Sequence, residues 1–482
     1  MRDLTENCIS ILNEAHFYVT DAGPLYQPVR GFSIRRDDRL RIVLATDADP
    51  NAISTVVEHP PGTVRTRTER VRLKSLGGLD GELLGVVPYN TKRRNVGEFE
   101  ESLKEESIVD IATTTNTAAA PAIRVIDWLE NLEKNSFLWP VESRVVSNAV
   151  TTRTISLDDG ITISSNSEER SFSRNAAKLT VGGVTFYVCA QDSEDRPDSI
   201  KPGCIIYDGV PDESFRKKIR VALSFALGLY LVDLGNTHYD ASWVAVSTLA
   251  RSAYSLGRRA FELHTLPLTP LGSRYPYELN PVQLTRAVTA FVNAFDSLDL
   301  ANLHWAYWHA CAATPHVAPA QFGAAIEALQ GAYIKANPGA VPKGSAPPKA
   351  WKELRAALVT TVESAGISAE AKAALKENVL KLNRIDQRQR LKLIMTALDL
   401  QLGGDEDAAW RRRNDAAHGT PIPEGQELAA IRDVKLLRGV FQRLLLRITN
   451  AADQYIDYAS LHHEYRILHE APPDQPALSP LD

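Results

Sequence analysis

The pattern of apolar residues changes near residue 212, and this change constrains the fold more than any other feature of the chain. Before it, short runs rich in β-branched residues alternate with turn residues, at 29–35, 40–46, 63–73, 83–87, 152–157, 178–181, 184–190 and 204–207. Beyond it, apolar residues recur every three or four positions, at 215–234, 242–256, 281–294, 300–312 and 319–336. Strands followed by helices predict an α+β protein.

We therefore expect a β-rich N-terminal domain at residues 1–211 and a helical middle region at 212–336. Two helices are expected inside the β-rich domain. One is a short acidic helix at 98–106, within a polar stretch, and the other is an amphipathic helix at 123–133.

A Pro/Gly-rich segment at 337–348 is expected to be a linker or a long loop before a C-terminal helical domain at 349–470. The helices expected in that domain are 351–365, 368–382 with Ser368 as its N-cap, 386–402, a short helix that ends before Gly419, and 425–458. Residues 471–482 include four prolines and are expected to form a disordered tail.

Composition indicates a soluble globular protein without marking a function. The net charge is −5 over 482 residues, so any nucleic-acid site must be a local basic patch. The four cysteines are scattered, which fits a reducing compartment better than a disulfide scaffold. The N-terminus lacks the apolar core of a signal peptide, and the apolar stretch 221–234 is too short to span a bilayer. We expect a cytoplasmic protein that does not contact a membrane.

The run Trp-Arg-Arg-Arg-Asn-Asp-Ala-Ala-His-Gly at 410–419 combines cations with a titratable imidazole on one short helix. Three acidic residues precede it at 405–407, where the helix begins, and Gly419 suits a left-handed C-terminal cap. Arg411, Asn414 and His418 share one stripe of this helix. Trp410, Arg413 and Ala417 share the neighbouring stripe, so we expect Arg413 to lay its stem on packed surface and present its guanidinium at the rim.

Arg413-Asn414 followed by His418-Gly419, with a long amphipathic helix downstream, resembles the arginine-x4-histidine motif of HEPN domains, a helical family that includes metal-independent RNA endonucleases. The resemblance covers the last quarter of the chain. A β-rich front before a helical half is also similar to the ApeA-type HEPN proteins of bacterial phage defence.

The resemblance implies that Arg413, His418 and Asn414 are catalytic, and that no cofactor or metal takes part. It implies attack by the RNA 2′-hydroxyl in a homodimer or larger even oligomer. Arg411 and Arg412 are candidates for RNA contact, and the apolar stripe of 425–458 is the expected dimer contact. Because a toxic nuclease must be restrained, we expect the N-terminal domain to respond to an unidentified activating ligand or phage component.

Several alternatives stay open. Arg259 and His264 repeat the motif spacing between apolar residues, which favours a structural helix end. His304, Trp308 and Cys311 share a helical stripe, and so do His462, Arg466 and His469, but the first set favours core packing and the second a solvated helix face. The main alternative for the domain is a non-catalytic HEPN-like module for dimerisation or scaffolding, which binds RNA or a protein partner.

Overall fold

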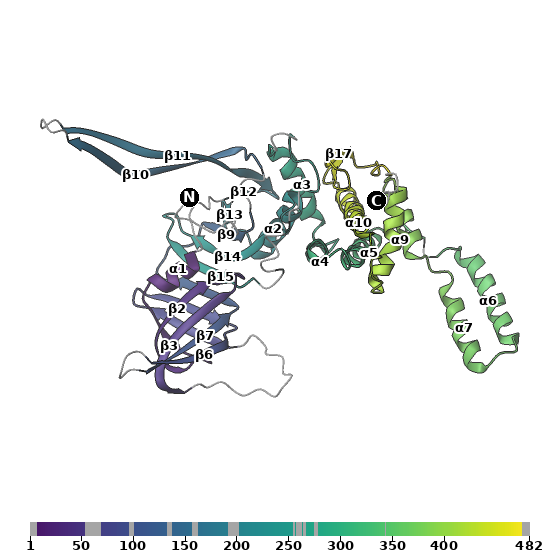
Figure 1. The fold of residues 1–482 in the computed structure, drawn as a ribbon, viewed down its shortest axis with the longest axis horizontal. Helices are drawn as coiled ribbons and strands as arrows, with labels where there is room; N and C mark the ends of the chain where they lie inside the picture. The colour runs from purple at the N-terminus through teal and green to yellow at the C-terminus, as the bar shows by residue number, and fades with distance from the viewer. Residues whose placement is uncertain are drawn as a thin grey trace. The chain divides into compact units, whose positions relative to one another are not determined.

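The computed structural model describes residues 7–53, 69–95, 101–132, 137–156, 162–190, 202–253, 256, 263, 267–273, 278–342 and 344–474. The chain divides into two compact units, Met1–Thr289 and Ala290–Asp482 (Figure 1). Strands dominate the first unit and helices the second, so the α+β prediction is confirmed. No helix in the described ranges is long and apolar enough to cross a membrane.

An eleven-stranded antiparallel sheet forms the frame of the first unit. It joins strands that are far apart in the sequence, because β15 (Ala245–Arg251) lies between β8 (Ile111–Asn116) and β14 (Val232–Tyr239), and β14 pairs with β9 (Arg124–Glu130). At one edge, β10 (Val141–Ser156) and β11 (Thr162–Val181) extend away from the sheet as a long hairpin (Figure 1). In spatial order the strands are β1 (Phe17–Asp21), β4 (Arg70–Ser75), β5 (Leu79–Leu84), β8 (Ile111–Asn116), β15 (Ala245–Arg251), β14 (Val232–Tyr239), β9 (Arg124–Glu130), β13 (Gly203–Tyr207), β12 (Val184–Ala190), β11 (Thr162–Val181) and β10 (Val141–Ser156).

A second, four-stranded sheet packs against one half of the first. Its strands, in spatial order, are β2 (Gln27–Arg36), β3 (Ile42–Ile53), β7 (Glu101–Val109) and β6 (Val87–Asn95). The apolar core between the sheets includes Ile34, Leu44, Val71 and Leu83, and helix α1 (Asn7–Glu14) contributes to it. Alternate residues of β4 are buried and exposed, as expected for a strand with one face on a core.

The two helices expected within the β-rich region are wrong. The segment 98–106 falls largely on β7, which pairs with β3 and β6, although residues 96–100 lie outside the described part. The segment 123–133 contains β9, where every residue from Val125 to Glu130 is buried. A strand covered on both faces shows no alternation, so its apolar spacing is compatible with a helix as well.

The β-rich region also extends beyond residue 211, to Arg251. The expected helix 215–234 ends as α2 (Glu213–Leu227), because Gly228 adopts a left-handed conformation with φ +66°, and the chain then enters β14. The expected helix 242–256 is wrong, since this segment forms β15 between β8 and β14. Pairing with two neighbouring strands outweighs the local helical spacing.

A buried carboxylate fixes α2 to the large sheet. Asp127 on β9 is fully buried and accepts hydrogen bonds from Arg216 and Arg220 of α2. Glu213, at the start of α2, forms ion pairs of 2.6 Å with both arginines. These contacts give each buried cation a carboxylate partner, as a buried charge requires.

Helices form most of the second unit. Helix α10 (Glu427–Thr449) packs against α5 (Ala318–Ala336) and α9 (Gly404–Ala417), and α4 (Leu300–Ala312) packs against α5. Helix α8 (Gln387–Ala397) contacts α5 and α9, whereas α6 (Pro348–Ser364) and α7 (Ala369–Lys381) form a hairpin (Figure 1). Helix α3 (Pro281–Ala294) spans the boundary between the units, and Ser368 caps α7 by accepting a hydrogen bond from the Ala371 amide.

The chain beyond α10 differs from the expectation. The expected helix 425–458 ends at Thr449, where Asn450 is left-handed, and a hairpin of β16 (Gln454–Asp457) and β17 (Glu464–Ile467) follows. Of the expected tail, residues 471–474 are described, and the Asp474 carboxylate accepts a hydrogen bond from the Asp405 amide at 2.9 Å. Residues 475–482 lie outside the described part.

We predict that Asp127→Ala loosens α2 from the sheet, because Arg216 and Arg220 would keep their charges in a buried place without their partner on β9, while Glu213 belongs to α2 itself. Breaking a buried pair in this way costs about 3–5 kcal/mol. Hydrogen exchange of the α2 and β9 amides in the full chain measures the loss. Asp49→Ala, which breaks the exposed Arg30–Asp49 pair of the same unit, is the control and should change little. Equal protection in both variants would contradict this prediction.

Candidate functional site

The motif helix α9 ends as expected. His418 is the C-cap residue, and Gly419 follows in the left-handed region with φ +72°. The Thr420 amide donates to the Asp415 carbonyl at 2.9 Å and the Gly419 amide to the Ala416 carbonyl at 3.2 Å. These two hydrogen bonds define a Schellman motif, which places His418 at the last turn of the helix.

The start of α9 is fixed by its three acidic residues, each of which has its own arginine. Asp405 pairs with Arg432 and Asp407 with Arg388, while Glu406 pairs with Arg443. A Glu406 oxygen also accepts a hydrogen bond from the Gly403 amide at 3.0 Å. The negative charge expected at this helix end is therefore bound into specific contacts as well as favouring the helix dipole.

Arg413 points into the helical unit, and its guanidinium does not reach the rim as we expected. The residue is 7% exposed, and its guanidinium lies 3.6 Å from the centroid of the Trp410 ring. One terminal nitrogen donates to the Trp410 carbonyl at 3.0 Å, and the other donates to a Glu327 oxygen of α5 at 2.5 Å. The stem does lie on packed surface, but the charge is directed toward α5.

Gly323 makes room for this arginine on α5. A Cβ atom at that position would lie 2.7 Å from Cδ of Arg413 and 2.9 Å from its Nε. Glu327 stands one helical turn beyond Gly323, so the same face of α5 supplies both the space and the counter-charge. Arg413 is thus held on three sides, by Trp410, Gly323 and Glu327.

The other stripe of α9 faces the solvent. Arg411, Asn414 and His418 are all exposed, as the helical spacing predicted, although Ala417 of the inner stripe is exposed too. The Asn414 side-chain oxygen accepts a hydrogen bond from Arg413 at 3.1 Å and so links the two stripes. The imidazole of His418 makes no hydrogen bond or ion pair within the described ranges.

Arg412 connects α9 to α10 rather than standing free. Its Nε and one terminal nitrogen each donate to an Asp433 oxygen at 2.6 Å. Such a bidentate pair fixes the crossing of the two helices. The side chain is still 54% exposed, so one side of the guanidinium faces water.

Two groups of residues near α9 were missed by sequence reasoning. The first is Glu327, which lies 86 positions before its partner Arg413, so no local spacing points to it. The second is the pair Arg388 and Lys392 on α8, which meets Arg411 around the carboxylate of Asp407. Arg388, supported by Lys392 and Arg411, keeps the pKa of Asp407 below its usual value, so this patch holds three cations and one anion.

The expected dimer contact on α10 is not available as a continuous stripe. Leu437, Val440, Phe441 and Leu444 are fully buried within the single chain, where α10 packs against α5 and α9. Large apolar side chains are exposed only at its start, where Leu428 is 57% and Ile431 40% exposed. We therefore correct this expectation: the apolar stripe of α10 stabilises the fold of its own chain.

The competing motifs give no second site. Trp308 is fully buried, and burial lowers the pKa of His304 to about 3, in keeping with core packing. Arg259 and His264 lie outside the described residues. The segment 462–470 is not a helix, and Arg466 pairs with Asp457 of the preceding strand. Within the described ranges, no three His, Cys, Asp or Glu residues are grouped as metal ligands would be.

No known protein family, curated protein or solved structure matches this chain. The chemistry of the residues around α9 is therefore what indicates a function. Those residues provide a fixed guanidinium, an exposed imidazole at the helix end and a small basic patch.

We predict that Arg413→Ala destabilises the helical unit by about 1–3 kcal/mol, because it removes a cation stacked on Trp410 and leaves Glu327 without its partner. Denaturation in urea, followed by circular dichroism, measures the change. Arg411→Ala, three-fifths exposed and 4.0 Å from Asp407, is the matched control and should stay within the error of the parent. The two variants would have equal stability if Arg413 were a surface residue.

Proposed function

We propose that the C-terminal helical unit is a metal-independent RNA endonuclease of the HEPN type, which acts as a homodimer or larger even oligomer. The observation that carries this proposal is the exposed imidazole of His418 at the end of α9, beside the Asn414–Arg413–Glu327 series of hydrogen bonds. A titratable group that faces solvent next to a fixed cation is the minimum that metal-free phosphodiester cleavage requires.

The reaction uses the nucleophile that RNA itself carries. His418 removes the proton of a 2′-hydroxyl or protonates the leaving 5′-oxygen, so that the 2′-oxygen attacks phosphorus and the bond to the 5′-oxygen breaks. The products are a 2′,3′-cyclic phosphate and a 5′-hydroxyl. His418 suits this role because its imidazole is exposed and is not engaged by another described side chain.

Arg413 can stabilise the negative charge of the transition state even though Glu327 holds it. A guanidinium has five N–H donors, and the hydrogen bonds to Trp410, Asn414 and Glu327 use three of them. A donor that is already fixed in place needs little reorganisation during the reaction. Glu327 is then a positioning residue for Arg413, and Asn414 orients the same guanidinium from the solvent side.

The RNA substrate binds to the basic patch formed by Arg388, Lys392 and Arg411. Asp407 forms the ion pairs of this patch and Asp386 lies near Arg388, so its three cations exceed the two nearby acids in a chain whose net charge is −5. Cations on a surface bind the phosphate backbone of RNA in a sequence-independent and salt-dependent way. A two-fold axis would place a second patch and a second His418 opposite the first.

The proposed nuclease function is compatible with a regulated role. We propose a cytoplasmic toxin or anti-phage effector whose nuclease is restrained until the N-terminal unit meets its trigger, an activating ligand or phage component. The N-terminal unit has its own extensive cores and would serve as the sensing part.

The alternative function is a non-catalytic helical module for dimerisation or scaffolding. The burial of Arg413 favours it, because an arginine held by Trp410, Gly323 and Glu327 has a complete structural role without any substrate. The two functions differ in what they demand of His418. Catalysis needs the exposed imidazole at the end of α9, whereas a scaffold does not need it.

We predict that His418→Ala lowers RNA cleavage by ~10²–10⁴-fold, the usual contribution of a proton-transfer group, without changing stability. Cleavage of a fluorescently labelled RNA measures the rate. The control is His316→Ala, an exposed histidine on the loop between α4 and α5, which should cleave like the parent. RNA methylated at the 2′-oxygen should resist the parent enzyme, and EDTA should leave cleavage intact. Absence of cleavage by the parent would favour the scaffold function, and unchanged cleavage in His418→Ala would show that the reaction does not use this site.

We also predict that adding His418→Ala chains to the parent lowers its cleavage activity by more than dilution does, because each composite site needs a histidine from both subunits. When equal amounts of the two chains exchange at random, about a quarter of the dimers are fully wild type, so a shared site would retain about a quarter of the activity. Sites that act independently would retain about half of it. Activity is measured against the mixing ratio, and light scattering verifies the dimer. A linear fall with the mutant fraction would exclude a shared site.

A further inference from the structure

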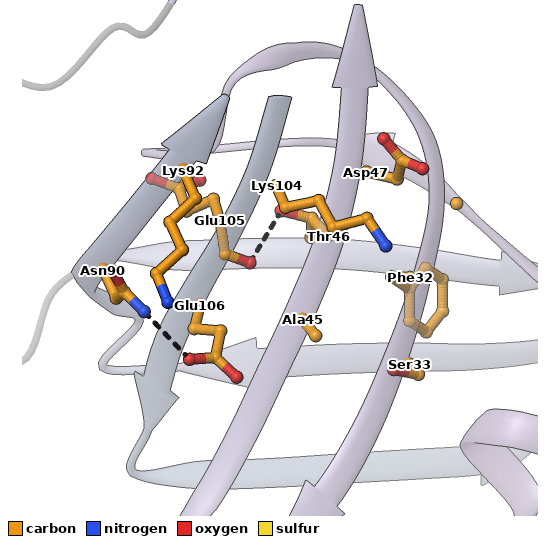
Figure 2. A pocket seen from close by; sticks show the side chains of 11 residues that line it. Phe32, Ser33, Ala45, Thr46, Asp47, Asn90, Lys92, Lys104, Glu105 and Glu106 are labelled. Atoms are coloured by element: carbon orange, nitrogen blue, oxygen red, sulfur yellow. Dashed lines mark hydrogen bonds between the residues drawn. The ribbon is translucent and has the colours of Figure 1, made fainter. Parts of the chain in front are cut away.

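The outer face of the four-stranded sheet carries a hollow of about 490 Å³ that the nuclease function does not use (Figure 2). It lies on the face turned away from the core of the first unit, and strands β2, β3, β6 and β7 all contribute to it. This volume is in the range of sites for small molecules. The residues that line it are Gly31, Phe32, Ser33, Ala45, Thr46, Asp47, Asn90, Lys92, Lys104, Glu105 and Glu106.

Small side chains leave the floor of the hollow open. Ser33 pairs with Ala45 across β2 and β3, and Gly31 pairs with Asp47 one row along. A Cβ atom added at Gly31 would meet no other atom within 4 Å. The sheet is therefore accessible here down to its backbone, whereas a sheet face with ordinary side chains would be covered.

Two lysines on this face stand directly opposite each other. Lys92 of β6 pairs with Lys104 of β7, both are exposed, and neither forms an ion pair within the described ranges. Like charges in a directly opposed pair destabilise a sheet unless an anion compensates them. In Figure 2 the two ammonium groups lie on different sides of the hollow, and each long stem can swing over the floor between them.

The acidic residues of the hollow do not cancel this charge. Glu106 already accepts hydrogen bonds from Arg35 at 3.0 Å, Tyr89 at 3.2 Å and Asn90 at 3.3 Å, and is thereby neutralised by Arg35. Asp47 lies opposite Lys104 but not within ion-pair distance, and its Oδ1 atom is buried without a hydrogen-bond partner. Glu105 also lines the hollow, and burial raises the pKa of its carboxyl, which favours the neutral form; its Oε2 atom, like Oδ1 of Asp47, is buried without a hydrogen-bond partner. Among the described residues, the hollow thus offers two lysines without an ion pair and two unused acceptors.

We propose that this hollow binds a small phosphate ester that carries hydroxyl groups, such as a sugar phosphate. Lys92 and Lys104 bind the phosphate group, and the buried oxygen of Asp47 accepts a hydrogen bond from a ligand hydroxyl. The flat floor formed by Gly31, Ser33 and Ala45 receives the body of the ligand. The site lies in the β-rich unit, which would thus bind a ligand of defined chemistry. This inference does not depend on the proposed nuclease function.

Isothermal titration calorimetry of the full chain with ribose 5-phosphate tests the site. We expect saturable binding that weakens with salt, and a loss of affinity of about tenfold or more in Lys92→Gln and in Lys104→Gln. Gly31→Leu should abolish binding, since its side chain enters open space and fills the floor without disturbing the backbone. Lys74→Gln, an exposed lysine of β4 in the same unit, is the matched control and should bind as the parent does.

Asp47→Ala separates the two parts of the proposed ligand. It should weaken ribose 5-phosphate but leave inorganic phosphate unchanged or slightly tighter, because it removes an acceptor and a negative charge together. Thermal unfolding of each variant without ligand verifies that the sheet is intact. Absence of binding by both compounds, or equal affinity in Lys92→Gln, Lys104→Gln, Gly31→Leu and Lys74→Gln, would overturn the proposal.

Discussion

The ion pair between Arg443 and Glu406 is sealed inside the helical unit, and the position of α9 depends on it. Arg443 is 0% and Glu406 1% exposed, and one guanidinium nitrogen contacts both carboxylate oxygens, at 2.9 and 3.0 Å. The other terminal nitrogen donates to the carbonyls of Gln401 and His469, so α10 holds both the chain entering α9 and the segment after β17. Glu406, Trp410 and Arg413 follow at helical spacing on one buried face, which carries this anchoring from the start of α9 to its motif.

Both units use arginine in the same physical way. In the first unit Arg216 and Arg220 meet the buried Asp127, and in the second Arg443 meets the buried Glu406. Burying a charge is costly unless it is paired and hydrogen-bonded, and arginine satisfies this demand with five donors in a rigid plane. In each case the pair joins elements that are distant in the sequence. Its main effect is therefore to fix the position of a helix, because charged groups add little apolar burial. Arg413, with Glu327 and Trp410, repeats the arrangement closer to the surface.

The sequence was sufficient wherever local chemistry decides the structure. The caps of α7 and α9, the helical stripe of Arg411, Asn414 and His418, and the overall order of strands and helices all follow from neighbouring residues. It failed where distant partners decide. Strand β9 has no alternating pattern because both faces are buried, and β15 is a strand because β8 and β14 lie on either side of it. The inward turn of Arg413 follows from Glu327 and Gly323, which no spacing around the motif reveals.

The strand order of the large sheet has a consequence for how the protein is made. Strand β8 has its partner β15 more than a hundred residues further along the chain, and the Thr114–Thr248 hydrogen bond between them spans 134 positions. At ordinary rates of synthesis the ribosome needs on the order of 10 s to cover that interval. During this time β8 and β9 each have an edge without the strand that will cover it, and an uncovered edge can pair with another chain. A nascent chain released before Val232 would keep both edges open, so the centre of the sheet, rather than its margin, is the last part of the first unit to be protected from aggregation.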